Sequence, residues 1–436
     1  MKTVFTLSSL LLASALLLTG HGIQITLLPL KAAQIGLSDT IIGFTGSAYF
    51  LGFVVGCFTV PQMIGRVGHI RAFAVLTSII VSALLSMQLF ETWPLWALAR
   101  AAIGFMMCGL YTIIESWLND QSTEATRGRV LASYTLITLL SMALGQFLLA
   151  QLSIQSATPF ILAAMLVSFA IVPVGLTRQL APAPMVPTRV SFGLLYKRSK
   201  VAFAGALMAG LVTGSFWALG AVFAKRTMGS LEDVSLFIAA AIMGGALLQY
   251  PVGLLSDYFG RSRVLVALSI LCAVTSLVVS MGDTRASLLV SIFLFGAVSM
   301  PIYALSLATV IDQAEAGEFV LVGTSVLLLN ATGAAIGPIA LGQLMDWADA
   351  RALWWGLSVI SIMCGSYIYL HRNDVGHTRP QDQTPFTVAA PEMAPTSFDM
   401  DPRGPEHSDT VIDPAPERPA FNEAPADDLD VDSVDR

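Results

Sequence analysis

Ionisable side chains inside long apolar runs are the first residues of this chain that could do chemistry. Three of them lie well within such runs: His21, Arg100 and Glu115. A charge at the centre of a membrane costs about 2.5–3.5 kcal/mol on insertion scales, so each is a candidate functional group. Arg100 can bind a substrate or pair with backbone carbonyls, and His21 can bind one or form a local hydrogen bond. Glu115 can carry a proton or tie its helix to Arg127 or Arg129.

Amide and aromatic side chains in the same runs add weaker candidates for substrate binding or coupling, with plain packing as the alternative for each. Gln24 lies in the same apolar run as His21. His21 and Arg100 are both expected in the outer half of the membrane. The further candidates, whose two tyrosines are expected at equal depth across the protein, are Tyr111, Trp217, Gln249, Tyr303 and Asn330.

The scatter of these groups limits the chemistry they can do. The sequence shows no clustered His, Asp and Glu and no nucleophile–base pair at one depth, so an enzyme is not expected. It has no G-x-x-x-x-G-K-[ST] motif for ATP, and we expect no nucleic-acid partner. Four cysteines, isolated in apolar runs, are expected to be small buried hydrophobic residues and predict no metal or cofactor site: Cys57, Cys108, Cys272 and Cys364.

The elements that hold these residues must be membrane-spanning helices. The chain has 436 residues, 55% hydrophobic and 12% charged, whereas soluble domains carry about 25% charged residues. A helix crosses the ~30 Å hydrocarbon layer with about 20 apolar residues, and its backbone satisfies its own polar groups. The sequence predicts an all-α integral membrane protein with twelve transmembrane helices, at 4–29, 40–63, 72–90, 94–117, 130–151, 158–177, 201–224, 234–256, 264–281, 287–310, 320–345 and 352–370.

Lysine and arginine in the short loops predict the orientation. With the N-terminus inside, thirteen of these residues lie in cytoplasmic segments and five in outer loops, as the positive-inside rule requires. Both termini are therefore expected on the cytoplasmic side of a bacterial-type inner membrane. A signal peptide cleaved near Ala13-Ser14-Ala15 is the alternative for the first run, but that run continues to Pro29 and is too long for one.

Two segments outside the apolar runs divide the chain. Residues 178–200 form a basic, proline-bearing cytoplasmic linker between the halves 1–177 and 201–371. Residues 372–436 hold 10 of the 21 prolines and 15 Asp/Glu against 5 Arg, a net charge of −10. The remainder carries 14 acids and 18 bases, a net of +4, so the overall −6 comes from this tail. The tail has too little apolar surface to offset its ordering entropy and is predicted to be disordered.

The two halves resemble each other in sequence. A shift of 192 residues without a gap pairs loop residues and glycines at matching places in the predicted helices. The three intramembrane charges are not shared between the halves, which favours a functional role for them. The pattern predicts two six-helix parallel repeats, an architecture of transporters that rock about a midplane site. Identical pairs include Gly22/Gly214, Gly52/Gly244, Gly68/Gly260, Arg71/Arg263, Gly104/Gly296 and Tyr111/Tyr303.

One cytoplasmic loop carries the most specific motif, Gly253-Leu-Leu-Ser-Asp257-Tyr-Phe-Gly260-Arg261-Ser-Arg263. Gly260 tolerates the positive φ of a chain reversal, and Asp257 can lie against a helix N-terminus, an interaction of about 0.3–1 kcal/mol. The pattern G-x-x-x-D-x-x-G-R-x-R/K at this place resembles the signature of the major facilitator superfamily. The resemblance implies a twelve-helix transporter fold and a gating role for the loop, with a loop that only sets topology as the alternative.

The first half has an incomplete copy of this motif. It keeps Arg66, Gly68 and Arg71, but Pro61 and Gly65 stand where the first glycine and the aspartate belong.

Charged residues on other helices supply the expected partners of both loops. We expect Asp257 to face the start of the fifth helix, at Arg127 and Arg129, and to latch the inner side in one conformation. The start of the eleventh helix, with Glu315 and Glu318, is expected to compensate for the aspartate missing from the first-half loop.

Further residues refine the resemblance. Arg100 with Gly104 is similar to the superfamily's R-x-x-x-G motif in the fourth helix. The resemblance also implies that the first and fourth helices line the central cavity, where His21, Gln24 and Arg100 are expected to form one polar patch. Gly145-Gln146 lacks the Gly-Pro of many drug/proton antiporters, which argues against that subclass. Glu115-Ser116 followed by Arg127-Gly128-Arg129 is similar to the YcaD-like branch, and the resemblance covers residues 1–372.

These features predict a secondary transporter that moves a small neutral or singly charged organic solute by alternating access. Glu115 and His21 are the candidates for proton coupling, uniport is the alternative, and import and export fit equally well. The alternative class is a transporter-fold sensor or scaffold that signals through the acidic tail. Deletion of residues 376–436 separates the two, because a carrier should still transport and a scaffold should lose its output.

Overall fold

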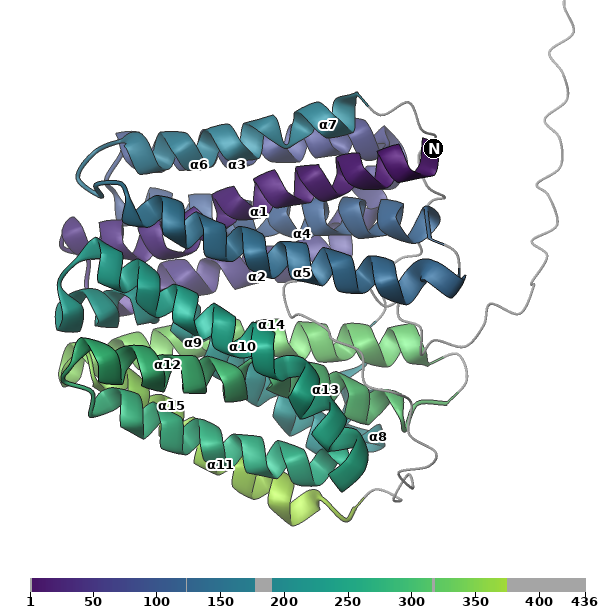
Figure 1. Ribbon diagram of the computed structural model, residues 1–436, viewed down its shortest axis with the longest axis vertical. Coiled ribbons are helices and arrows are strands. Elements are labelled where there is room, and N and C mark those ends of the chain that lie inside the picture. The colour runs from purple at the N-terminus through teal and green to yellow at the C-terminus, as the bar shows by residue number, and fades with distance from the viewer. Residues whose placement is uncertain (1, 123, 177–189, 316–317, 375–436) are drawn as a thin grey trace, which may run out of the picture. The chain divides into compact units, whose positions relative to one another are not determined.

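Each apolar run of the sequence folds into a helix, because a backbone in lipid must satisfy its polar groups within the segment. The computed structural model describes residues 2–122, 124–176, 190–315 and 318–374, and its regular elements there are helices (Figure 1). The first half contains α1 (Lys2–Gln34), α2 (Asp39–Val67), α3 (His69–Leu89), α4 (Trp93–Asp120), α5 (Glu124–Ala150), α6 (Thr158–Phe169) and α7 (Ile171–Gly175). After α8 (Phe192–Arg198), the second half contains α9 (Lys200–Met228), α10 (Leu231–Phe259), α11 (Arg261–Ser280), α12 (Arg285–Ser299), α13 (Pro301–Ile311), α14 (Phe319–Trp347) and α15 (Ala352–His371).

The predicted twelve membrane spans are confirmed among the described residues. Two spans are interrupted, Thr158–Gly175 between α6 and α7 and Arg285–Ile311 between α12 and α13. Pro173 and Pro301 account for these breaks, because proline lacks an N–H and its ring clashes with the preceding turn. The first helix continues to Gln34, well beyond the predicted end at residue 29.

Close helix crossings recur at the same repeat positions in both halves. A Cβ added to Gly104 of α4 would lie 1.9 Å from the carbonyl oxygen of Tyr49 in α2. A Cβ added to Gly296 of α12, 192 residues later, would lie 2.1 Å from the carbonyl oxygen of Ala241 in α10. Only glycine allows backbones to approach so closely. The pairs α1–α5 and α9–α14, and α3–α6 and α11–α15, also correspond, which confirms the two parallel repeats.

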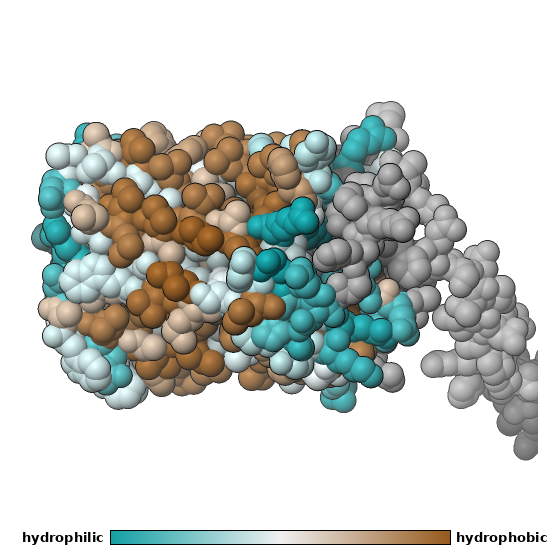
Figure 2. Space-filling model, turned by 90° about the horizontal axis from the view of Figure 1, so that it is seen from below, coloured by the Kyte–Doolittle hydropathy of each residue, from teal (hydrophilic) through white to brown (hydrophobic). Residues whose placement is uncertain are grey.

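The two ends of the helix bundle are distinguished by their turns. The linker end carries α8 and the turns at Gly68 and Gly260, whose φ angles of 83° and 92° confirm the predicted chain reversals. The far end carries the turn before Asp39 and the end of α14. Between them, the face in Figure 2 is broadly hydrophobic (brown) with hydrophilic (teal) residues toward both ends, as expected for a surface in contact with lipid.

Part of the predicted linker is itself helical. The Ser191 hydroxyl accepts a bond from the backbone N–H of Leu194 and caps α8, a helix that the sequence did not predict. The division into 1–177, 178–200, 201–371 and 372–436 stays a prediction. Residue 177 of the first half, residues 178–189 of the linker and residues 375–436 of the tail lie outside the described residues.

Candidate functional site

Three helices of the first half bring a guanidinium and two rings together. Arg100 of α4 places its Cζ 4.9 Å from the centre of the Tyr49 ring in α2. His21 of α1 stacks on the same ring, with centroids 5.8 Å apart. Arg100 is 8% exposed, Tyr49 7% and His21 3%. The structure therefore brings His21 and Arg100 together, and Tyr49 joins them.

Several polar groups in and beside this cluster lack partners. Gln24, one turn beyond His21, is fully buried, and neither atom of its amide forms a hydrogen bond. The Nδ1 atom of His21 is also unbonded. Within the described part of the chain, Arg100 pairs with no carboxylate. Because buried polar groups in native proteins are nearly always satisfied, these unbonded groups make the cluster a candidate site for a ligand.

The fold does not require this polar cluster, since the second half carries uncharged, mostly apolar residues at the same positions. Phe216, the repeat mate of Gln24, packs with ring centroids 4.9 Å from Trp217 and 5.6 Å from Phe295. The helix pairs of the two halves pack alike despite this difference. The repeat mates of His21, Gln24, Tyr49 and Arg100 are Thr213, Phe216, Ala241 and Ile292.

Glu115 lies apart from the cluster. It is fully buried, 15 residues after Arg100 on α4, a separation of about 22 Å at 1.5 Å per residue. The predicted tie to Arg127 or Arg129 stays a prediction, because the side chain of Arg127 lies outside the described residues and that of Arg129 is exposed.

The remaining predicted candidates occupy four other helices besides α4, and their roles stay predictions. Tyr111 of α4 and Tyr303 of α13 are both buried, at matching repeat positions. Asn330 of α14 is 4% exposed with its Oδ1 unbonded, and Gln249 of α10 is 7% exposed. Trp217 of α9 is half-buried.

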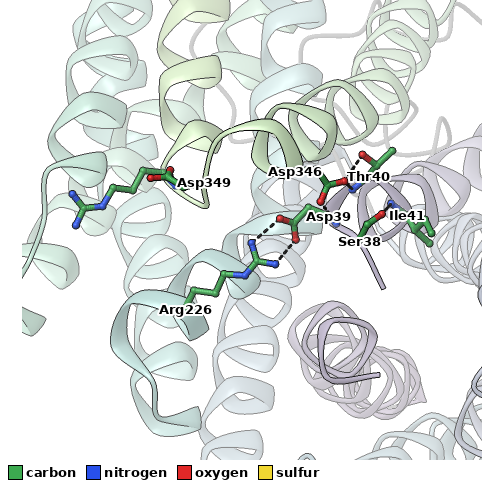
Figure 3. A network of polar contacts seen from close by, with 8 residues as sticks. Ser38, Asp39, Thr40, Ile41, Arg226, Asp346 and Asp349 are labelled. Atoms are coloured by element: carbon green, nitrogen blue, oxygen red, sulfur yellow. Dashed lines mark hydrogen bonds and ion pairs between the residues drawn. The ribbon is translucent and has the colours of Figure 1, made fainter. Parts of the chain in front are cut away.

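A polar network at the far end joins the two halves (Figure 3). The buried Asp39 carboxylate accepts two bonds from Arg226 of α9, at 2.6 and 2.7 Å. The Asp346 carboxylate of α14 accepts the backbone N–H groups of Asp39 and Thr40, at 2.8 and 2.9 Å, and the Thr40 hydroxyl. The first N–H groups of a helix have no partner within it and favour a nearby anion. The second half thus caps the first turn of α2, and we call this set of four residues the far-end latch.

Sequence reasoning missed the far-end latch because its members look like ordinary charges at helix ends. Asp39 follows Ser38, whose hydroxyl accepts the N–H of Ile41, a common helix start. A carboxylate 2% exposed is unusual at such a place, but burial is not visible in the sequence.

At the linker end, the motif of the second half forms a buried charge cluster. Arg261 forms an ion pair with Asp312, with its Nε 2.7 Å from the carboxylate, and both side chains are 3% exposed. Asp257 lies 3.7 Å from Nη2 of the same arginine. Among the other predicted gating residues, Gly253 is buried, while Arg66, Arg71 and Arg263 are exposed and Gly68 is half-buried. The predicted contact of Asp257 with Arg127 falls on a side chain outside the described residues.

The first-half loop differs from that cluster in chemistry. His69 stands at the repeat position of Arg261 and is buried, with Nε2 3.5 Å from the Ser116 hydroxyl. Its ring lies 5.5 Å from that of Trp117.

The acids at the start of α14 have a different partner from the one the sequence suggested. Glu315 and Glu318 were expected to compensate for the aspartate missing at Gly65. In the structure they bind Arg198 of α8, at 2.7 and 2.9 Å. The Arg198 bond holds the pKa of Glu318 below its ordinary value. These carboxylates therefore fasten the linker helix to the second half.

Two hollows on the surface contain none of the predicted substrate residues. One, of about 470 Å³ near the far end, is lined by charged residues that include Arg226, Asp283 and Arg351. The other, of about 520 Å³, is an apolar groove between α11 and α15. No group of three metal-ligating side chains occurs in the part of the chain that the structure describes.

Comparison with known proteins identifies the family. The profile of the Major Facilitator Superfamily matches residues 10–216 and 201–398, one match for each half. The chain belongs to the major facilitator superfamily. It is 27% identical to the uncharacterized MFS-type transporter YcaD of Escherichia coli O17:K52:H18 over 388 residues, which cover 86% of this chain and 98% of the relative. The sequence-based assignment to this family and to YcaD-like relatives is thus confirmed.

Solved superfamily structures share the fold. The nucleoside transporter NupG superposes with a TM-score of 0.69 at 13% identity, covering 84% of this chain and 98% of that one. A bacterial homologue of the human lysosomal transporter Spinster, inward-facing and occupied, gives a TM-score of 0.68 at 14% identity, with coverage of 87% and 97%. This superfamily member is therefore a multi-pass membrane transporter by family, and it has the fold of these solved transporters.

Proposed function

We propose that this superfamily member is a secondary active transporter that moves a small organic solute across a bacterial inner membrane by alternating access. The observation that carries the proposal is the buried His21–Tyr49–Arg100 cluster, with unbonded Gln24 beside it, in the membrane core of one half only. Binding sites of such transporters lie near the midplane of the bilayer. His21 is close to the middle of the span Ser8–Gln34, which agrees with that depth.

The far-end latch supports alternating access. It joins α2 of one half to α9 and α14 of the other by five direct polar contacts. Such contacts must break before the halves can separate at that end, so they stabilise a conformation closed there. The lysines and arginines of the linker-end loops assign the linker end to the cytoplasm, and the far-end latch then closes the outer side.

Proton coupling is part of the proposal. Glu115 lies fully buried toward the linker end of α4, and His21 lies in the cluster. A proton held on either group between the two sides would couple the solute to the proton gradient.

Reconstitution into proteoliposomes tests the proposal. Purified protein is screened for solutes that raise its melting temperature, and each hit is tested for counterflow into vesicles loaded with the same solute. Arg100→Gln should abolish counterflow, whereas Arg285→Gln, at an exposed pair outside the core, should not. Counterflow absent for every stabilising solute would refute the carrier. Internal pyranine reports coupling, which Glu115→Gln or His21→Asn should remove if the assigned group carries the proton.

A further inference from the structure

We infer that the substrate is an organic anion whose carboxylate binds Arg100. This inference rests on the proposed function, because it names the solute class for the same site. It follows from three observations: the charge inventory of the membrane core, the geometry of the guanidinium, and the unbonded groups beside it.

The charge inventory leaves Arg100 without a counterion. Between residues 1 and 371, the acids of the helices lie at or near their ends, apart from Glu115. Glu115 is about 22 Å away along α4. A buried cation without a partner is strongly unfavourable, since its desolvation is not offset by a nearby opposite charge. An anion that binds beside such a cation offsets the cost of its desolvation, so the buried cation favours an anionic ligand.

The geometry leaves the binding edge of Arg100 available. Its guanidinium carbon lies over the Tyr49 ring, 4.9 Å from the ring centre, and this cation–π contact is not a hydrogen bond from an N–H group. The N–H groups of arginine lie in its plane and match the two oxygens of a carboxylate. Among the described residues, no side chain or carbonyl accepts a hydrogen bond from these N–H groups.

The groups beside Arg100 suit the rest of an oxygen-bearing ligand. The unbonded amide of Gln24 offers a donor and an acceptor, and His21 offers its free Nδ1. The repeat mates Thr213, Phe216 and Ile292 cannot provide an equivalent charged site. The anion therefore binds to the first half, and one bound monoanion neutralises the one cation there.

The first test compares two buried arginines in protein without ligand. Arg100 lacks a counterion, whereas Arg261, 3% exposed, is paired with Asp312 at 2.7 Å. Arg100→Met should leave the melting temperature unchanged or raise it, since it removes an uncompensated buried charge. Arg261→Met should lower it by several degrees, because it strands Asp312. A similar fall in Arg100→Met would mean that Arg100 has a structural partner and would overturn the inference.

The second test uses matched acids and amides: acetate and acetamide, hexanoate and hexanamide, benzoate and benzamide, salicylate and salicylamide. At constant ionic strength, at least one acid should raise the melting temperature of the wild type while its amide does not. Arg100→Gln should weaken the binding of that acid at least tenfold, roughly the effect of losing one charge-assisted bidentate contact. Equal shifts by acid and amide, no shift by any acid, or a shift that survives in Arg100→Gln would each overturn the inference.

Transport assays distinguish the proposed anion site from the proposed carrier function. An acid that binds through Arg100 but gives no counterflow would support the anion site and refute the carrier. Counterflow of a neutral solute that is unaffected by Arg100→Gln would support the carrier and overturn the anion site.

Discussion

Replacing Asp39 by asparagine should open the far end of the bundle. The substitution removes the charge that Arg226 binds but keeps the size of the side chain and the backbone N–H groups that Asp346 caps. It therefore isolates the ion pair of the far-end latch from its helix cap. Arg226→Gln removes the other partner, and the double variant completes a cycle that measures their coupling.

The structure bounds the size of the effect. Fully exposed ion pairs contribute about 0.2–1 kcal/mol, and breaking a buried pair costs about 3–5 kcal/mol. Asp39 is 2% exposed and Arg226 44%, with contacts of 2.6 and 2.7 Å, so solvent screens half of this pair. We expect a coupling of about 1–2 kcal/mol, which shifts the balance between closed and open far ends by about 5–30-fold.

Double electron–electron resonance, which measures the distance between two spin labels, provides the assay. Spin labels at Thr92 and Ala286, both exposed near the far end on different halves, report its opening in protein whose native cysteines have been replaced. Asp283→Asn is the matched control, because it breaks the 2.6 Å pair with Arg351, which lies within the second half. If Asp39→Asn leaves the distance distribution the same as the control does, the far-end latch does not hold the halves together and the reasoning is wrong.

Three further predictions concern stability. Asp312→Asn should lower the free energy of unfolding by about 3 kcal/mol or more, because it leaves buried Arg261 without its ion-pair partner. Asp257→Asn changes a 29% exposed carboxylate 3.7 Å from that arginine and should lower the free energy of unfolding by under about 1 kcal/mol. Equal melting temperatures for the two variants would contradict this prediction. Gly104→Ala should destabilise the protein by about 1–3 kcal/mol or more, since its Cβ would lie 1.9 Å from a carbonyl oxygen. Gly65→Ala, whose Cβ would have no atom within 4 Å, should stabilise α2 by about 0.5–1 kcal/mol. Thermal unfolding in detergent should therefore give a lower melting temperature for Gly104→Ala than for Gly65→Ala. Arg198 depresses the pKa of Glu318, so their contact adds stability above the unfolded pKa of about 4.3, and this stability is lost as the pH falls through the lower folded pKa. The hydrogen-exchange rate of α8, corrected for intrinsic rates, should rise below about pH 4 in the wild type. A Glu318→Gln variant that shows the same rise would exclude this cause.

The patterns that report the fold are local and periodic. Apolar runs of about 20 residues require helices in lipid, and Gly68 and Gly260 could be predicted as reversals because only glycine adopts positive φ without strain. The repeat of 192 residues paired Gly104 with Gly296, and the structure places both at close helix crossings, since both halves need the same close approach.

The sequence also singled out part of the site. His21, Gln24 and Arg100 stand out because polar groups in apolar runs are costly wherever the helices pack. The repeat mates of His21 and Arg100, Thr213 and Ile292, carry no charge, which marked these two residues further without any knowledge of contacts.

Tertiary structure alone decided which groups meet. Tyr49 is an ordinary aromatic residue in sequence, and only the packing of α2 against α1 and α4 places it beside His21 and Arg100. Glu318 turned out to bind Arg198 rather than serve the first-half loop. The far-end latch joins Asp39 to residues 187 and 307 positions away. Burial and long-range pairing fix these contacts, and both depend on how separate helices come together in space rather than on the order of residues along any one of them.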